Sequence, residues 1–143
     1  MIRKANIGDF DSIARLESET FSDPLTESFL SNELKNNPFA NYFVAELDGK
    51  VIGYIGSWIT DNTEILNFCV DINYRNNGIG NELFGAVNNI HIGMISLEVR
   101  ETKLGARRFY ERQGFKSVAI RKNYYSNGDN AILMVKEWFA WSY

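Results

Sequence analysis

A glycine-containing turn is the segment whose residue types and spacing point most directly to chemistry. Arg75 is followed by Gly78 and Gly80, between an expected strand and an expected helix. Glycines let backbone N–H groups approach an anion, and the first turn of a helix adds positive potential. A pyrophosphate is the ligand that such a turn would bind, although a tight turn without a ligand shows the same pattern. The segment is not a Walker loop, since no Lys-Ser or Lys-Thr follows Gly80, nor a dinucleotide fingerprint, since Leu83 replaces its third glycine.

Other side chains of reactive type have structural explanations when each is taken alone. Glu98 interrupts an apolar stretch, as a solvated carboxylate on a strand would, and Tyr110 continues the apolar face of a helix. Cys69 lies in an apolar strand, which favours a buried thiol over an acetyl-carrying nucleophile. Arg100 is interpreted as a structural ion-pair partner. His91 follows a helix, where histidine is common, and receives no role.

Hydrophobic spacing predicts the elements that must position these groups. Asp48-Gly49 between two apolar runs predicts a hairpin, Asp23-Pro24 predicts a helix start, and Gly93 and Gly114 are expected to end helices. Helices are expected over residues 10–20, 24–34, 79–90 and 102–113, and strands over 2–5, 42–47, 51–60, 64–70, 94–99, 115–120 and 130–135. The sequence therefore predicts one α+β domain over residues 1–143, with a mostly antiparallel sheet of about six to seven strands and about four helices.

Composition excludes several classes of protein. A chain of 143 residues with 45% hydrophobic positions can build one core, which excludes a disordered or collagen-like chain. Fifteen basic against 18 acidic residues give a net charge of -3, so direct nucleic-acid binding is not expected. One cysteine and one histidine exclude disulfide scaffolds and multi-histidine metal sites. The sequence has no apolar run of membrane-spanning length and no signal-peptide pattern, so a cytoplasmic protein is expected.

Several ordered motifs resemble one known family. The run 65–70, followed by Tyr74 to Gly80, resembles the acetyl-CoA signature of the GNAT family of N-acetyltransferases. The segments 96–100, 109–115 and 120–125, with Asp129 just before the last strand, resemble the RimI branch, which acetylates the N-terminal alanine of a ribosomal protein. The resemblance covers nearly the whole chain, in order and without a foreign insertion. It is therefore far more specific than the glycine turn.

The resemblance implies direct acetyl transfer from acetyl-CoA to an amine, without a metal. The general base of the family corresponds to Glu98 and the general acid to Tyr110. Tyr124 and Tyr125 correspond to residues that line the groove for the substrate N-terminus, with aromatic packing as the alternative. The coenzyme-binding positions correspond to Phe68, Cys69 and Val70 for the pantetheine and thioester, and to Arg75, Asn76, Asn77, Gly78, Ile79, Gly80 and Asn81 for the pyrophosphate.

Two departures from the RimI pattern leave other functions open. Lys103 stands where the pattern usually has a cofactor-contacting asparagine, and we expect this lysine to reach a phosphate instead. The helix 79–90 also runs into the next strand through a connection about one turn shorter than usual. The alternatives are a transferase for a small amine or a lysine side chain, and a weakly catalytic acetyl-CoA-binding module. Such a module would dock on a protein partner through the aromatic tail 138–143.

Overall fold

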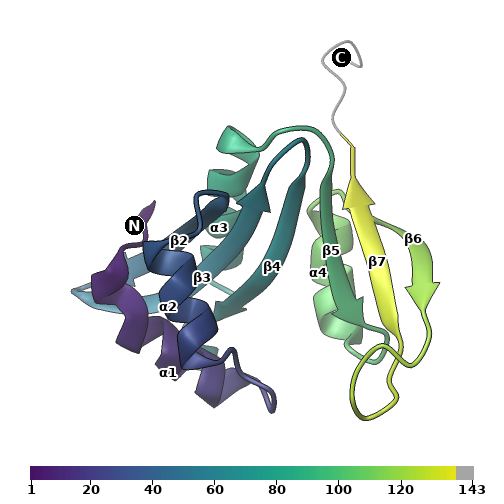
Figure 1. Cartoon of the computed structure of the whole chain (residues 1–143), viewed down its shortest axis with the longest axis horizontal. Coiled ribbons are helices and arrows are strands. Elements are labelled where there is room, and N and C mark those ends of the chain that lie inside the picture. The colour runs from purple at the N-terminus through teal and green to yellow at the C-terminus, as the bar shows by residue number, and fades with distance from the viewer. Residues whose placement is uncertain (138–143) are drawn as a thin grey trace.

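The computed structural model describes residues 1–137, and its strands form one sheet in the order β1-β2-β3-β4-β5-β7-β6 (Figure 1). Every neighbouring pair is antiparallel except β4 and β5, which are parallel. The expected α+β fold with a mostly antiparallel sheet is confirmed. The strands are β1 Ile2–Lys4, β2 Ala40–Leu47, β3 Lys50–Ile59, β4 Thr63–Val70, β5 Ile95–Arg100, β6 Lys116–Arg121 and β7 Ala131–Lys136.

Helices cover both faces of the sheet, and each face has its own apolar core. α1 and α2 lie on one face, and α3 and α4 lie on the other (Figure 1). Ile13, Leu16 and Leu30 fill the first core, whereas Leu83 and Phe84 belong to the second. The helices are α1 Phe10–Thr20, α2 Glu27–Lys35, α3 Ile79–Ile90 and α4 Leu104–Arg112, with short 3-10 turns η1 Ile7–Asp9 and η2 Ile72–Tyr74.

The hairpin between β2 and β3 forms where the sequence predicts it. Asp48 and Gly49 have φ values of 50° and 78°, so both turn residues adopt the left-handed conformation that a two-residue hairpin of this type requires. The turn brings Leu47 opposite Lys50. The long strands β2 and β3 consequently form the centre of the larger half of the sheet.

The expected start of α2 at Asp23-Pro24 is wrong. The helix begins at Glu27, and its N-cap is Thr26, whose hydroxyl accepts a hydrogen bond from the Phe29 N–H at 3.2 Å. The preceding residues stay non-helical because the buried Glu17 carboxylate accepts a hydrogen bond from the Leu25 N–H at 2.9 Å. A side-chain contact from another helix therefore overrides the local signal.

Helix α3 spans the expected residues 79–90, but Gly93 does not form its C-terminal cap. The last helical residue is Ile90, and the four-residue connection to β5 is hydrogen-bonded to Thr63, the first residue of β4. There the Thr63 hydroxyl accepts from the Ile92 N–H and donates to the Ile92 carbonyl, both at 2.9 Å. Gly93, with φ 62°, serves this connection instead of the helix end.

Candidate active site

The parallel strands β4 and β5 pair over only three positions and then diverge. The last paired residues are Ile65 on β4 and Leu97 on β5. Leu66 is an extra residue in β4, because Ile65 and Asn67 pair with adjacent residues of β3. Beyond these positions the edge of β4 that faces β5 has no partner strand, and Figure 1 shows the two arrows spreading apart. We call this opening the fork; its β4 edge is residues 66–70.

The predicted thioester-binding residues lie along this edge and alternate between the two faces of the sheet. The Phe68 ring stacks on Phe109 of α4, with a centroid distance of 5.5 Å, and Val70 belongs to the same core. Cys69 points to the opposite face, where its sulfur accepts a hydrogen bond from the Thr20 hydroxyl at 3.8 Å. Burial raises the pKa of the Cys69 thiol to about 12, so the thiol stays protonated and is a poor nucleophile.

The glycine turn forms an open anion cradle at the start of α3. Gly78 is the N-cap residue with φ 81°, and no side chain caps the first turn of the helix, so its N–H groups are not used by a capping side chain. Asn76 also has a positive φ, of 65°. Arg75 donates from Nε to the Val70 carbonyl at 2.9 Å, which fixes the turn to the end of β4. Asn77 donates to the carbonyls of Tyr74 and Arg75.

Gly80 is required by close packing. A Cβ atom at this position would lie 2.9 Å from Cζ of Phe109 and 3.1 Å from Cζ of Phe68. Ile79 packs against the adjoining core, and the side chain of Asn81 accepts a hydrogen bond from Gln113. Rings from α4 and β4 therefore hold the start of α3 directly beside the fork.

Lys103 is an exposed residue at the N-cap of α4, three residues after the end of β5. Within residues 1–137, no hydrogen bond or ion pair joins its side chain to the glycine turn. Its expected contact with a phosphate stays a prediction.

Glu98 is the first residue of β5 that no longer pairs with β4. Its neighbours Leu97 and Val99 belong to the core under α3 and α4, so its own side chain points to the face of α1 and α2. Oε2 lies 3.0 Å from Nε of Arg121, and the Tyr124 hydroxyl lies 3.5 Å from Oε1. The carboxylate therefore stands at the fork with one cation and one phenol beside it.

Tyr110 packs from α4 into the aromatic cluster under the sheet. Its ring lies 5.9 Å from Phe84, 6.3 Å from Phe115 and 6.4 Å from Phe68, measured between centroids. Burial raises the pKa of the Tyr110 hydroxyl to about 12, above its ordinary value near 10. The phenol therefore stays protonated throughout the physiological pH range.

The two tyrosines after β6 stand beside the candidate base. Tyr124 and Tyr125 pack edge to face with centroids 5.1 Å apart, and the guanidinium of Arg100 lies 3.9 Å above the Tyr125 ring. Arg100 also donates to Asp129 at 3.1 Å, so the ion pair expected for it is present. Its other nitrogen lies 4.0 Å from Asp23, in the segment between α1 and α2.

A buried polar network on the face of α1 and α2 was not predicted from the sequence. Glu17 accepts a very short hydrogen bond from the Tyr54 hydroxyl, and Glu33 accepts from Tyr42 and Trp58 at 2.8 and 2.6 Å. Both carboxylates are nearly inaccessible. The missed signal was helical spacing, because each glutamate lies on the apolar face of its helix, beside Leu16 or Leu30 and Leu34.

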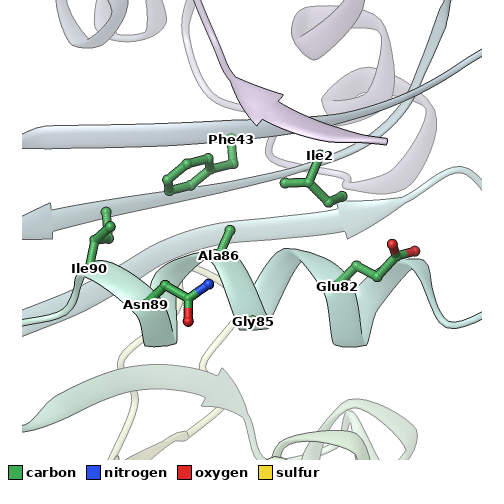
Figure 2. Close-up of a pocket in the computed structure, with 7 residues that line it drawn as sticks. All are labelled: Ile2, Phe43, Glu82, Gly85, Ala86, Asn89 and Ile90. Atoms are coloured by element: carbon green, nitrogen blue, oxygen red, sulfur yellow. The ribbon is translucent and has the colours of Figure 1, made fainter.

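A pocket of about 480 Å³ lies away from the fork. Figure 2 shows it between α3 and the strands β1 and β2, with Ile2, Phe43 and Ala86 among its apolar lining. None of the predicted site residues lines it. Within residues 1–137, no three metal-binding side chains of the His, Cys, Asp or Glu type gather in one place. No helix in this range is long and apolar enough to cross a bilayer.

Comparisons with known proteins agree on the family. The model of the acetyltransferase (GNAT) family matches residues 10–115. A Bacillus subtilis protein, provisionally named a ribosomal protein bS18-alanine N-acetyltransferase, is 34% identical over 93% of this chain and 92% of that protein. The Haemophilus influenzae protein of the same name is 33% identical over 88% and 90%. The solved structure of the ribosomal-protein-S18-alanine N-acetyltransferase from Escherichia coli has a TM-score of 0.87, with 22% identity, over 100% of this chain and 97% of that one.

Proposed function

Because the chain belongs to the acetyltransferase (GNAT) family, we propose that it transfers acetyl from acetyl-CoA to the N-terminal α-amine of a protein that begins with alanine. The relatives of Bacillus subtilis and Haemophilus influenzae, named for the alanine of ribosomal protein bS18, support a ribosomal protein as the natural substrate. The observation that carries the chemistry is the fork, which joins an anion cradle at one end to a carboxylate at the other. This proposal also places the protein in the cytoplasm, where ribosomal proteins are made.

The fork fits the two chemical parts of acetyl-CoA. The uncapped start of α3, from Asn76 to Asn81, presents backbone N–H groups and a positive helix end, which suit a pyrophosphate. The β4 edge at Phe68, Cys69 and Val70 presents backbone groups that β5 does not use, and these suit the amides of a pantetheine arm. In this arrangement Arg75 stabilises the turn by its bond to Val70.

Glu98 is assigned to accept the proton that the attacking amine must lose. A protein α-amine has a pKa of about 7.7–8.0, so the neutral form costs only about 1 kcal/mol at pH 7, against about 4.6 kcal/mol for lysine. One carboxylate acting directly or through water is enough for the first case. Tyr124 approaches the Glu98 carboxylate at 3.5 Å, which supports its assignment to the wall of the amine site together with Tyr125.

Tyr110 is assigned to give a proton to the departing sulfur. A phenol of pKa about 12 loses its proton to a thiolate of ordinary pKa, about 8.5, at a cost of about 5 kcal/mol. That cost fits within the barrier of about 16 kcal/mol that corresponds to a turnover of about 10 per second. The raised pKa therefore favours a hydrogen bond to the sulfur first and proton transfer late in the reaction.

Mass spectrometry of acetyl transfer to three substrates tests the proposal. The substrates are a peptide with a free N-terminal alanine, the same peptide blocked at its N-terminus but carrying a lysine, and a polyamine. Acetylation of the first substrate alone supports the proposal. Acetylation of the lysine or the polyamine would replace it by the first alternative function. Binding of acetyl-CoA without transfer would replace it by the docking module, whose expected docking segment, 138–143, lies outside the described residues.

A further inference from the structure

Arg121 lies beside the candidate base and has no role in the chemistry derived above. It ends β6, where it pairs with Ala131 of β7, and Ala131 pairs in turn with Arg100 of β5. Paired residues of a sheet point to the same face, as do residues two apart in one strand, so this row faces the same way as Glu98. The Arg121 side chain reaches across β7, and its Nε lies 3.0 Å from Oε2 of Glu98.

The guanidinium of Arg121 keeps its N–H donors available. Its contact with Glu98 is an ion pair without a hydrogen bond, because Oε2 is buried and accepts none within residues 1–137. In the same part of the chain, no other hydrogen bond or ion pair engages the Arg121 side chain, which is 53% exposed. A guanidinium carries five N–H donors in a rigid planar fork. Arg121 therefore presents donors to solvent directly beside the carboxylate.

The other arginine of this row, Arg100, has its donors engaged by neighbouring side chains. It donates to Asn127 at 3.0 Å and to Asp129 at 3.1 Å, and its guanidinium lies over the Tyr125 ring. These contacts hold Arg100 against the connection between β6 and β7. Of the two arginines, Arg121 is therefore the one whose donors a substrate can use.

An N-terminal residue is complementary to Glu98 and Arg121 together. Oε1 of Glu98 is free to accept from an amine, because the Tyr124 hydroxyl approaches it only to 3.5 Å. The amine nitrogen and the carbonyl oxygen of one residue lie roughly 3 Å apart, as standard bond lengths require. That separation matches the 3.0 Å between the carboxylate and the guanidinium. A lysine amine, in contrast, stands at the end of a four-carbon stem and has no carbonyl beside it.

We propose that Arg121 donates to the carbonyl oxygen of the substrate's first residue while Glu98 accepts from its amine, so that the two side chains select N-terminal residues over lysine side chains. The inference rests on the proposed function and deepens it. The opposite charges of Glu98 and Arg121 leave no net charge between them, which suits a residue that brings one donor and one acceptor. Hydrogen bonds between a guanidinium and an oxygen are among the stronger ones, so the contact can carry specificity. Arg121 thus belongs to the binding of the peptide, not to that of acetyl-CoA.

The test changes the protein and the substrate separately and then together. Arg121→Met removes the donors, and replacing the first peptide bond of an alanine-starting peptide by a carbon–carbon double bond removes the carbonyl while keeping the shape. The matched control is Lys122→Met, because Lys122 is the adjacent exposed cation and no hydrogen bond or ion pair within residues 1–137 engages it. The measurements are kcat/KM for both peptides with all three proteins, the Kd of acetyl-CoA, and the melting temperature.

We expect Arg121→Met to lower kcat/KM for the ordinary peptide by about tenfold to a hundredfold, the usual worth of a hydrogen bond to a charged group. The double-bond peptide should lose a similar factor with the wild type, and Arg121→Met should lower its kcat/KM by less than about threefold further. Lys122→Met should leave both values within about twofold, as should the Kd of acetyl-CoA in every protein. An equal factor for both peptides would overturn the inference, because Arg121 would then act on Glu98 alone, and so would an unchanged kcat/KM in Arg121→Met.

Competition within one peptide gives a second readout. On a peptide with a free N-terminal alanine and an internal lysine, Arg121→Met should reduce the preference for the N-terminus by about tenfold or more, whereas Lys122→Met should keep it. An unchanged preference in Arg121→Met would contradict the selective role. Should the methionine variant fail to fold, Arg121→Ser at the same half-exposed position decides the question. Failure of the proposed function is seen separately, because the wild-type protein would then acetylate no α-amine.

Discussion

Replacing Tyr110 by phenylalanine separates its chemical role from its packing. The ring lies in an aromatic cluster with Phe84 and Phe115, and phenylalanine keeps these contacts. Loss of the proton donor should lower kcat by about a hundredfold, the low end for an acid–base group. The Kd of acetyl-CoA should stay within about twofold. Rates at saturating substrates and calorimetry of acetyl-CoA binding measure the two quantities.

The same variant tests the buried environment of the phenol. The pKa of Tyr110 is raised to about 12 in the folded protein, above the value of about 10 expected when unfolded. A raised pKa means that the folded state holds this proton more tightly, so its contribution is complete below pH 10 and is lost as the pH rises toward 12. At pH 11 the wild type should lose about 1.4 kcal/mol of unfolding free energy through this group alone.

Urea unfolding of both proteins at pH 8 and pH 11 measures that loss. The difference in unfolding free energy between wild type and Tyr110→Phe should shift by about 1.4 kcal/mol in favour of the variant at the higher pH. Other tyrosines ionise equally in both proteins and cancel in the comparison. A shift near zero would refute the buried phenol, and an unchanged kcat would remove Tyr110 from the mechanism.

Four further predictions concern other parts of the molecule. Glu98→Gln should lower kcat/KM by a factor that shrinks as the pH rises, because more of the amine is then neutral. Rates measured from pH 6.5 to 9.5 test this; the same loss at every pH would mean that Glu98 positions the amine and does not take its proton. Gly80→Ala should weaken acetyl-CoA binding at least tenfold by calorimetry, because its Cβ atom would displace the Phe109 ring; retained affinity would contradict the packing argument. Cys69→Ala should keep kcat within about threefold, and the wild-type thiol should resist alkylation at pH 8, because burial raises its pKa to about 12; an inactive variant would reopen a covalent route. Thr26→Ala should cost about 1 kcal/mol in urea unfolding, the usual value of a helix cap, and no cost would mean that another group caps α2.

Turn residues and apolar spacing predicted most of the fold, because each of these patterns specifies one element within a short stretch of sequence. Asp48-Gly49 specifies a hairpin whatever surrounds it, and the apolar spacing from Ile79 to Ile90 specifies α3. The start of α2 could not be found this way. The local signal at Asp23-Pro24 is overridden by the hydrogen bond from the Leu25 N–H to the Glu17 carboxylate, which is a contact with a separate helix.

The candidate site was predicted through the family resemblance, and its contacts needed the structure. Neither the 3.5 Å approach of Tyr124 to Glu98 nor the ion pair of Glu98 with Arg121 follows from spacing, since β6 and β5 are joined only through β7. The pKa of Tyr110 depends on burial that the helix pattern alone does not quantify.

The choice between an α-amine and a lysine is the central claim, and one peptide can test it. A peptide with a free N-terminal alanine and one internal lysine is incubated with the protein and acetyl-CoA at pH 7, and fragmentation mass spectrometry locates the acetyl group at early times. The neutral fraction favours the α-amine by about two orders of magnitude, and the greater basicity of lysine offsets part of this advantage. The account predicts acetylation of the N-terminus over lysine by at least about tenfold. Equal or faster acetylation of the lysine would contradict it.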